Sequence, residues 1–182
     1  MALKPLALAT ALLAVSSATA FAATAASVQL KDKDGKPVGN VALRQTTSQG
    51  VWMNLVIDNL PAGPHAFHVH ETGKCEGEFK SAGGHFNPAG MKHGVLVEGG
   101  PHAGDLPNIH VPDSGRLTVE FFAPHITLER GAKNSVFDED GSALVIHAGV
   151  DDYKSQPAGE AGGRIACGVV SGEITGAPSN TK

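Results

Sequence analysis

The sequence predicts an all-β domain built as an antiparallel sandwich or barrel. Eight short segments rich in β-branched and apolar residues recur between turn residues, which is the spacing of such folds. The chain holds 23 glycines and 11 prolines in 182 residues, a load that excludes a coiled coil or a long helical bundle. Helical periodicity is missing from every window longer than about ten residues.

The predicted strands follow one another between clusters of turn residues. The turn at 33–37 separates the first strand from the second, Gln49-Gly50 separates the second from the third, and a Pro- and Gly-rich cluster at 59–64 precedes the fourth. The fifth has the weakest pattern. In chain order the predicted strands are Ser27–Leu30, Val41–Arg44, Val51–Ile57, His65–His70, Asn108–Val111, Leu117–Phe122, Ala143–His147 and Arg164–Val170.

Residues 1–22 have the layout of a secretory signal peptide. Lys4 provides an early positive charge, and Leu6–Val15 is a run of apolar and small residues. Ala20-Phe21-Ala22 offers a small-residue cleavage site, with Ala18-Thr19-Ala20 as the alternative. The apolar run of about ten residues is half of the ~20 that a membrane span needs. We therefore expect cleavage after Ala22, a mature domain over 23–182 with a tail from about residue 173, no membrane attachment after cleavage, and a periplasmic or secreted location.

Charge and cysteine content narrow the function classes. The formal net charge is −4, so a protein that binds nucleic acid through bulk positive charge is excluded. Cys75 and Cys167 are the two cysteines of the chain, and an oxidising compartment favours a disulfide between them. Two buried thiols, or one reactive thiol, are the alternatives.

Nine histidines are the anomaly of the composition. His68 and His70 lie on one predicted strand, two residues apart, so their side chains share a face. Two long Gly-rich stretches, Glu71–Asp105 and Asp151–Gly163, interrupt the strand pattern, and loops of that length are usually functional. Imidazole and carboxylate groups suit copper and zinc. The residues that match such a ligand set are His68, His70, His85, His93, His102, Asp105 and His147, the right number for two metal sites that share one ligand.

Six segments, in this order, resemble copper/zinc superoxide dismutases: AFHVH, AGGHFNP, KHG, GDLPN, VIHAGVDDY and GGRIACGV. The resemblance covers about Ser27–Glu173. Within the family, the chain is similar to the bacterial periplasmic branch. It implies an eight-stranded antiparallel Greek-key β-barrel with two long functional loops. It also implies one copper ion and one zinc ion per chain.

The resemblance assigns a role to individual residues. His68, His70, His85 and His147 match the copper ligands, and His85, His93, His102 and Asp105 match the zinc ligands. His85 would bridge the two ions. Asp151 matches the carboxylate that links a copper-site histidine to a zinc-site histidine, expected here to be His68 and His93. Arg164, three residues before Cys167, matches the arginine that draws a small anion towards copper.

The function that follows from the resemblance is an oxidoreductase. It would disproportionate the superoxide anion to O₂ and H₂O₂ by alternating Cu(II) and Cu(I), with Arg164 and His85 as catalytic residues and zinc as a structural and tuning ion. It would protect against oxidative stress outside the cytoplasm, as a monomer or a homodimer. The alternative is a non-catalytic metal-binding or metal-delivery module on the same scaffold. His65, His110 and His125 fall outside the ligand pattern, so we expect structural or surface roles for them.

Overall fold

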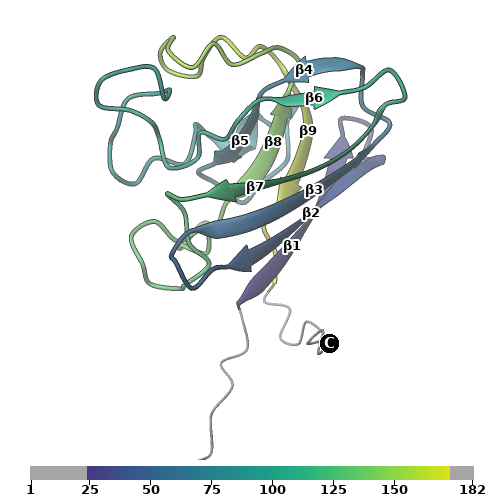
Figure 1. The fold of residues 1–182 in the computed structure, drawn as a ribbon. Helices are drawn as coiled ribbons and strands as arrows, with labels where there is room; N and C mark the ends of the chain where they lie inside the picture. Colours follow the sequence, from purple (N-terminus) through teal and green to yellow (C-terminus); the bar gives the residue numbers. More distant parts are fainter. Residues whose placement is uncertain (1–23, 173–182) are drawn as a thin grey trace, which may run out of the picture.

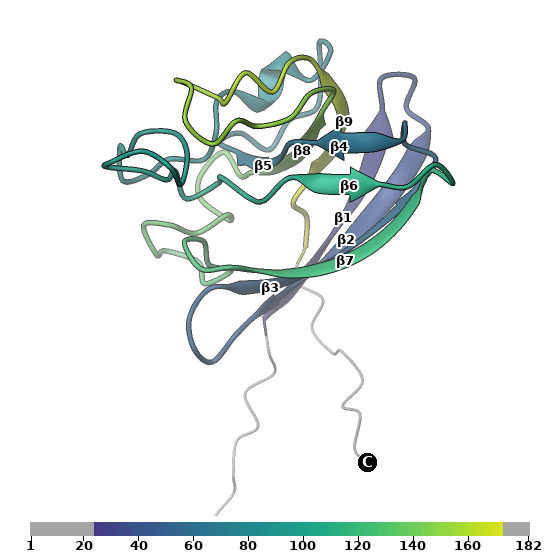
Figure 2. The same cartoon turned by 45° about the horizontal axis from the view of Figure 1, so that its top comes forward.

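The fold is a curled antiparallel β-sheet that closes about halfway into a barrel (Figures 1 and 2). The computed structural model describes residues 24–172; the predicted leader and the predicted tail lie outside these residues. Within them the strands are β1 (Ala25–Asp32), β2 (Pro37–Gln45), β3 (Val51–Asp58), β4 (Gly63–His65), β5 (Phe67–His70), β6 (Ile109–Val111), β7 (Arg116–Ala123), β8 (Ala143–His147) and β9 (Arg164–Val169), with one 3-10 turn, η1 (Lys80–Ala82). No helix in this range is long and apolar enough to cross a membrane.

Seven strands form one sheet in the order β5-β8-β9-β1-β2-β3-β7, and β4 pairs with β6 in a second sheet. The small sheet connects the two edges of the large one, because β4 leads directly into β5 and a tight turn at 112–115 leads from β6 into β7 (Figure 2). The expected all-β fold is therefore confirmed.

The first strands bury one face, as their alternating pattern requires. Inward residues of β1, β2 and β3 form the core, whereas their neighbours in sequence face solvent. Fully or almost fully buried examples are Val28, Leu30, Val41, Leu43 and Leu55.

Strands β5 and β8 differ because both of their faces are covered. Phe67 and Val69 pack into the main core, so the residues that alternate with them on β5 point to the outer face. A smaller apolar cluster covers the outer face of β8 and β9, and its members are Phe79, Ala82, Ala143, Val145 and Cys167, with Cys75 at its edge. The loop after β5 thus folds back over the sheet and keeps water from that face.

The predicted strand His65–His70 is divided in two. Ala66 interrupts it: its N–H donates to the carbonyl of Gly149, and its carbonyl accepts from the N–H of His147. Ala66 is therefore the corner at which the chain passes from the small sheet to the large one. The other predicted strands are present, and the strand at 143–147 has the predicted bounds.

Candidate metal centre

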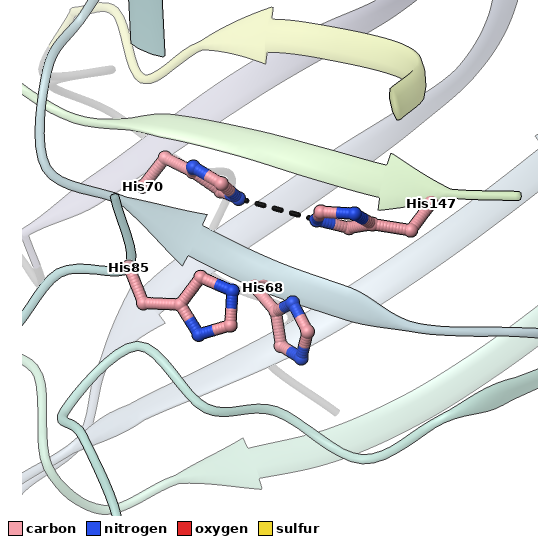
Figure 3. A group of neighbouring side chains, drawn as sticks. All are labelled: His68, His70, His85 and His147. Carbon is pink, nitrogen blue, oxygen red and sulfur yellow. Dashed lines mark hydrogen bonds between the residues drawn. The ribbon is translucent and has the colours of Figure 1, made fainter. Parts of the chain in front are cut away.

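Three histidines of the candidate centre come from two adjacent strands. His68 and His70 share the outer face of β5, and His147 ends β8, the antiparallel neighbour of β5. Each is at most 4% exposed. Figure 3 shows these three rings converging with that of His85. Two strands of one sheet therefore bring together residues that lie nearly 80 positions apart in sequence.

His85 arrives from the long loop. The loop backbone runs alongside β5, where His85 forms a β-bridge with His70 and the N–H of Phe86 donates to the carbonyl of Val69 at 2.8 Å. The sheet edge therefore positions a residue that belongs to no strand. The potential ligand atoms of His68, His70, His85 and His147 all lie within 4.8 Å of one another.

The hydrogen bonds around His70 and His147 point two lone pairs at the same place. The Nδ1–H of His70 donates to the carbonyl of Gly83 at 3.0 Å, and that of His147 donates to the carbonyl of Gly162 at 3.3 Å. A neutral imidazole has a single N–H, so both Nε2 atoms then carry lone pairs. These Nε2 atoms lie 3.3 Å apart (dashed line in Figure 3). Two facing lone pairs repel each other, whereas a cation bound between them would attract both.

Two further nitrogens of this group fit a metal. The Nδ1 of His68 and the Nε2 of His85 are buried and have no hydrogen-bond partner among the described residues. Buried polar atoms are almost always paired, so each such atom in a native fold needs an explanation. Four imidazole nitrogens that converge without protons form a donor set suited to copper.

The second group surrounds the carboxylate of Asp105. One oxygen, Oδ1, lies 2.8 Å from the Nδ1 of His85, 3.1 Å from that of His93 and 3.2 Å from that of His102. The other oxygen accepts from the backbone N–H groups of Gly94 and His102. Three imidazoles and one carboxylate within 4.8 Å of one another form a donor set suited to tetrahedral zinc.

His85 belongs to both groups. Its Nδ1 faces Asp105, and its Nε2 faces the strand histidines. Each ring nitrogen can hold one metal ion when both protons have been removed. The shared ring is the geometry that the sequence resemblance implied for a bridging ligand.

Asp151 ties the two groups together from behind. Its Oδ2 accepts from the Nε2–H of His68 at 2.8 Å, and its Oδ1 accepts from the Nε2–H of His93 at 2.9 Å. These bonds hold the proton of each ring on Nε2 and leave Nδ1 free for a metal. The expected link between His68 and His93 is present in the structure.

Asn108 holds Asp151 in place, a role that the sequence did not indicate. The side-chain amide of Asn108 pairs with both the backbone N–H and the backbone carbonyl of Asp151 at 2.9 Å.

Burial keeps the strand histidines neutral. It lowers the pKa of His68 to about 4, that of His70 to about 2 and that of His147 to about 3, with repulsion from His85 adding to each shift. Burial alone would raise the pKa of Asp105, but hydrogen bonds from His85 and Gly94 outweigh it and hold that pKa well below its usual range. Neutral imidazoles and an ionised carboxylate are the states that bind metal ions.

Arg164 begins β9 opposite His147, next to a register shift in the β8–β9 pair. Its guanidinium donates to the carbonyls of Phe79 and Gly83, and the Gly83 carbonyl also accepts from His70. These contacts fix the plane of the guanidinium beside the histidines. Three residues further on, Cys167 forms a disulfide with Cys75, so the expected bridge is confirmed. It fastens the long loop to β9.

Two of the histidines outside the ligand pattern take different positions. His65 is buried, and its ring nitrogens lie 2.9 Å from the carbonyl of His147 and 3.0 Å from that of Pro61, a structural position. His110 is exposed on β6. Neither belongs to a ligand group in the described range.

The half-closed barrel and two histidine-rich groups with one ring in common define a protein built to hold two metal ions. A family model described as copper/zinc superoxide dismutase (SODC) matches residues 38–170. The chain therefore belongs to the copper/zinc superoxide dismutase family, a family of oxidoreductases that use copper and zinc and act on superoxide. The expectation from the sequence resemblance is confirmed.

Individual relatives agree with this assignment. The chain is 56% identical over 141 residues to superoxide dismutase [Cu-Zn] 1 of Aquifex aeolicus (strain VF5), covering 76% of this chain and 83% of the relative. It is 37% identical to an extracellular superoxide dismutase [Cu-Zn] of Haemonchus contortus, covering 76% and 77% of the two chains. The crystal structure of a double mutant of a SOD-like protein from Bacillus subtilis superposes with a TM-score of 0.77 at 42% identity, covering 80% of this chain and 97% of that chain.

Proposed function

We propose that His68, His70, His85 and His147 hold copper, that His85, His93, His102 and Asp105 hold zinc, and that this centre disproportionates superoxide. The observation that carries the proposal is the ring of His85, which turns one nitrogen to each group. Bound copper supplies a one-electron redox couple for converting two superoxide anions and two protons into O₂ and H₂O₂, and bound zinc supplies fixed charge without redox chemistry.

In this proposal the protein residues attract the anion, orient it and supply a proton. Arg164 commits part of its guanidinium to two backbone carbonyls and keeps further N–H groups for an anion beside His70 and His147. The Nε2 of His85 would take up and return a proton only when it is not bound to copper, because its Nδ1 is held on the side of Asp105. Asp151 keeps the rings of His68 and His93 in the orientation that leaves Nδ1 for metal.

We further propose that the protein is exported and acts in the periplasm or outside the cell. The disulfide between Cys75 and Cys167 supports an oxidising compartment, and one relative is an extracellular enzyme. The proposed leader, residues 1–22, lies outside the described residues. Intact-mass analysis of protein from the extracytoplasmic fraction should give a chain that begins near residue 23, and a full-length chain in the cytoplasm would contradict the proposal.

Metal content and dismutase activity on the same sample test the central proposal. The wild-type chain should bind one copper and one zinc and should dismutate superoxide. His85→Ala should lose most of the activity and weaken the binding of both ions, whereas His110→Ala, a matched histidine on β6, should change neither. Full zinc occupancy and near-normal turnover in His85→Ala would refute the shared-ligand assignment. Two bound metals without activity in the wild type would favour the metal-delivery alternative.

A further inference from the structure

The exposed side chain of Gln156 forms two hydrogen bonds with the backbone of His93, a proposed zinc ligand. The side-chain oxygen of Gln156 accepts from the backbone N–H of His93 at 2.9 Å, and its side-chain nitrogen donates to the backbone carbonyl of the same residue at 2.9 Å. The amide thereby satisfies both backbone groups of His93, in the manner of a neighbouring β-strand. Gln156 itself is exposed on the surface, while His93 is completely buried.

The segment that carries His93 needs such support. The loop between β5 and β6 contains a single three-residue turn, η1, and no strand. A loop without regular structure must satisfy its buried N–H and C=O groups by other means, or pay the cost of leaving them unpaired. On either side of His93 the partners belong to the same loop, since Lys92 N–H donates to the carbonyl of Gly99 and Gly94 N–H to Asp105. For His93 itself they come from the second long loop, where Gln156 bonds to both backbone groups.

The same short stretch also holds the His93 ring. The carboxylate of Asp151 accepts from Nε2, and Gln156, five residues later, holds the main chain. The side-chain amide of Gln156 is held in turn by the carbonyl of Lys154 at 3.0 Å. His93 is thus fixed at both ends by one loop, and its remaining nitrogen, Nδ1, is aimed at Asp105.

We propose that Gln156 is a positioning residue for the zinc group: it joins the loop at 148–163 to the His93 backbone and so slows the release of zinc. The inference rests on the proposed assignment of His93 as a zinc ligand. Outer contacts of metal ligands commonly change metal affinity by about 10–100-fold. Because Gln156 acts through the backbone of the ligand, we expect an effect at the lower end of that range.

The test compares zinc release from the mature chain loaded with copper and zinc. A chromophoric chelator in excess reports the rate of release. Gln156→Met keeps the length of the side chain and removes both bonds, so release should be about tenfold faster. Gln156→Glu keeps an acceptor for the His93 N–H and loses the donor to its carbonyl, so its release rate should fall between those of the wild type and Gln156→Met.

Gln45 provides a matched control. Its amide oxygen accepts from Leu128 N–H and Thr127 Oγ1–H, and its nitrogen donates to the carbonyl of Gly50, so it also joins a strand to a loop, outside both ligand groups. Gln45→Met should lower the melting temperature and leave zinc release unchanged. Substitution of Co(II) at the zinc group adds a spectroscopic reading, since its visible d–d bands should shift in Gln156→Met and not in Gln45→Met.

The outcomes separate the inference from the function beneath it. The inference would be overturned if Gln156→Met released zinc at the same rate as the wild type and left the Co(II) bands unaltered. It would also be overturned if Gln45→Met accelerated zinc release as much as Gln156→Met. Wild-type protein that binds no zinc, or His93→Ala that retains it as well as the wild type, would instead overturn the proposed zinc assignment and the inference with it.

Discussion

The stability of the metal-free protein should depend steeply on pH between about 7.5 and 5. Burial lowers the pKa of three strand histidines, His68, His70 and His147, to about 4, 2 and 3. In the unfolded chain each has an ordinary pKa of about 6.5. At pH 5 the unfolded state therefore binds about three protons that the folded state excludes. The unfolding free energy therefore decreases as pH falls, because protons stabilise the unfolded state, which binds more of them.

The size of the effect follows from the number of protons. One excluded proton changes the unfolding free energy by about 1.4 kcal/mol per pH unit well below the unfolded pKa. Integrated from pH 7.5 to pH 5, each histidine contributes about 2 kcal/mol and the three contribute about 6 kcal/mol. That is comparable to the whole stability of a typical domain, roughly 5–15 kcal/mol. The stability is fully present above about pH 6.5 and is lost as pH falls towards the folded pKa values.

Urea unfolding of the metal-free protein, with the disulfide intact, measures this directly. The unfolding free energy should fall by about 6 kcal/mol between pH 7.5 and pH 5, or the protein should already be unfolded at pH 5. His70→Gln removes one titrating ring and should reduce the dependence by about a third. The copper- and zinc-loaded protein should be more stable at each pH, because the ions bind the folded state. Its pH dependence should be at least as steep, because the metal-bound rings still exclude the protons that the unfolded chain binds. A change below about 2 kcal/mol in the metal-free protein would show that the rings are hydrated and would refute the reasoning.

Three further perturbations probe the surroundings of the centre. Arg164→Glu should retain both metals and slow superoxide turnover about tenfold or more at low salt, since the guanidinium beside the histidines attracts the anion; loss of copper would indicate a structural role instead. Replacing Cys75 and Cys167 together with serine should lower the unfolding free energy by about 4–5 kcal/mol and reduce metal retention while strand content by circular dichroism stays constant; unchanged melting and metal content would contradict this. Gly159→Ala should reduce zinc retention, because a Cβ there would clash with the carboxylate of Asp151 that links the two groups. Gly162→Ala has a similar positive φ but its nearest neighbour is at 3.6 Å, so it should retain zinc; equal retention in both variants would exclude the steric explanation.

Sequence periodicity determined those features of the proposed metal centre that lie within a single strand. Residues two apart on a strand share a face whatever packs against them, so His68-Val69-His70 predicted a pair of imidazoles on one side before any fold was known. The strand at 143–147 has the predicted bounds because its apolar run ends at a histidine and a glycine-containing turn. Resemblance to the family, carried by short motifs, supplied the remaining proposed ligands.

Only the tertiary structure decided which nitrogen of each ring is available to a metal. That choice depends on carbonyls that are distant in sequence, such as Gly83 for His70 and Gly162 for His147, and on Asp151 for His68. The tertiary structure also divides the predicted strand at Ala66, because the chain passes there from one sheet to the other. Such contacts arise when the loops pack over the sheet. No local pattern in the sequence encodes them, since the acceptor is in most cases a backbone carbonyl, which every residue possesses.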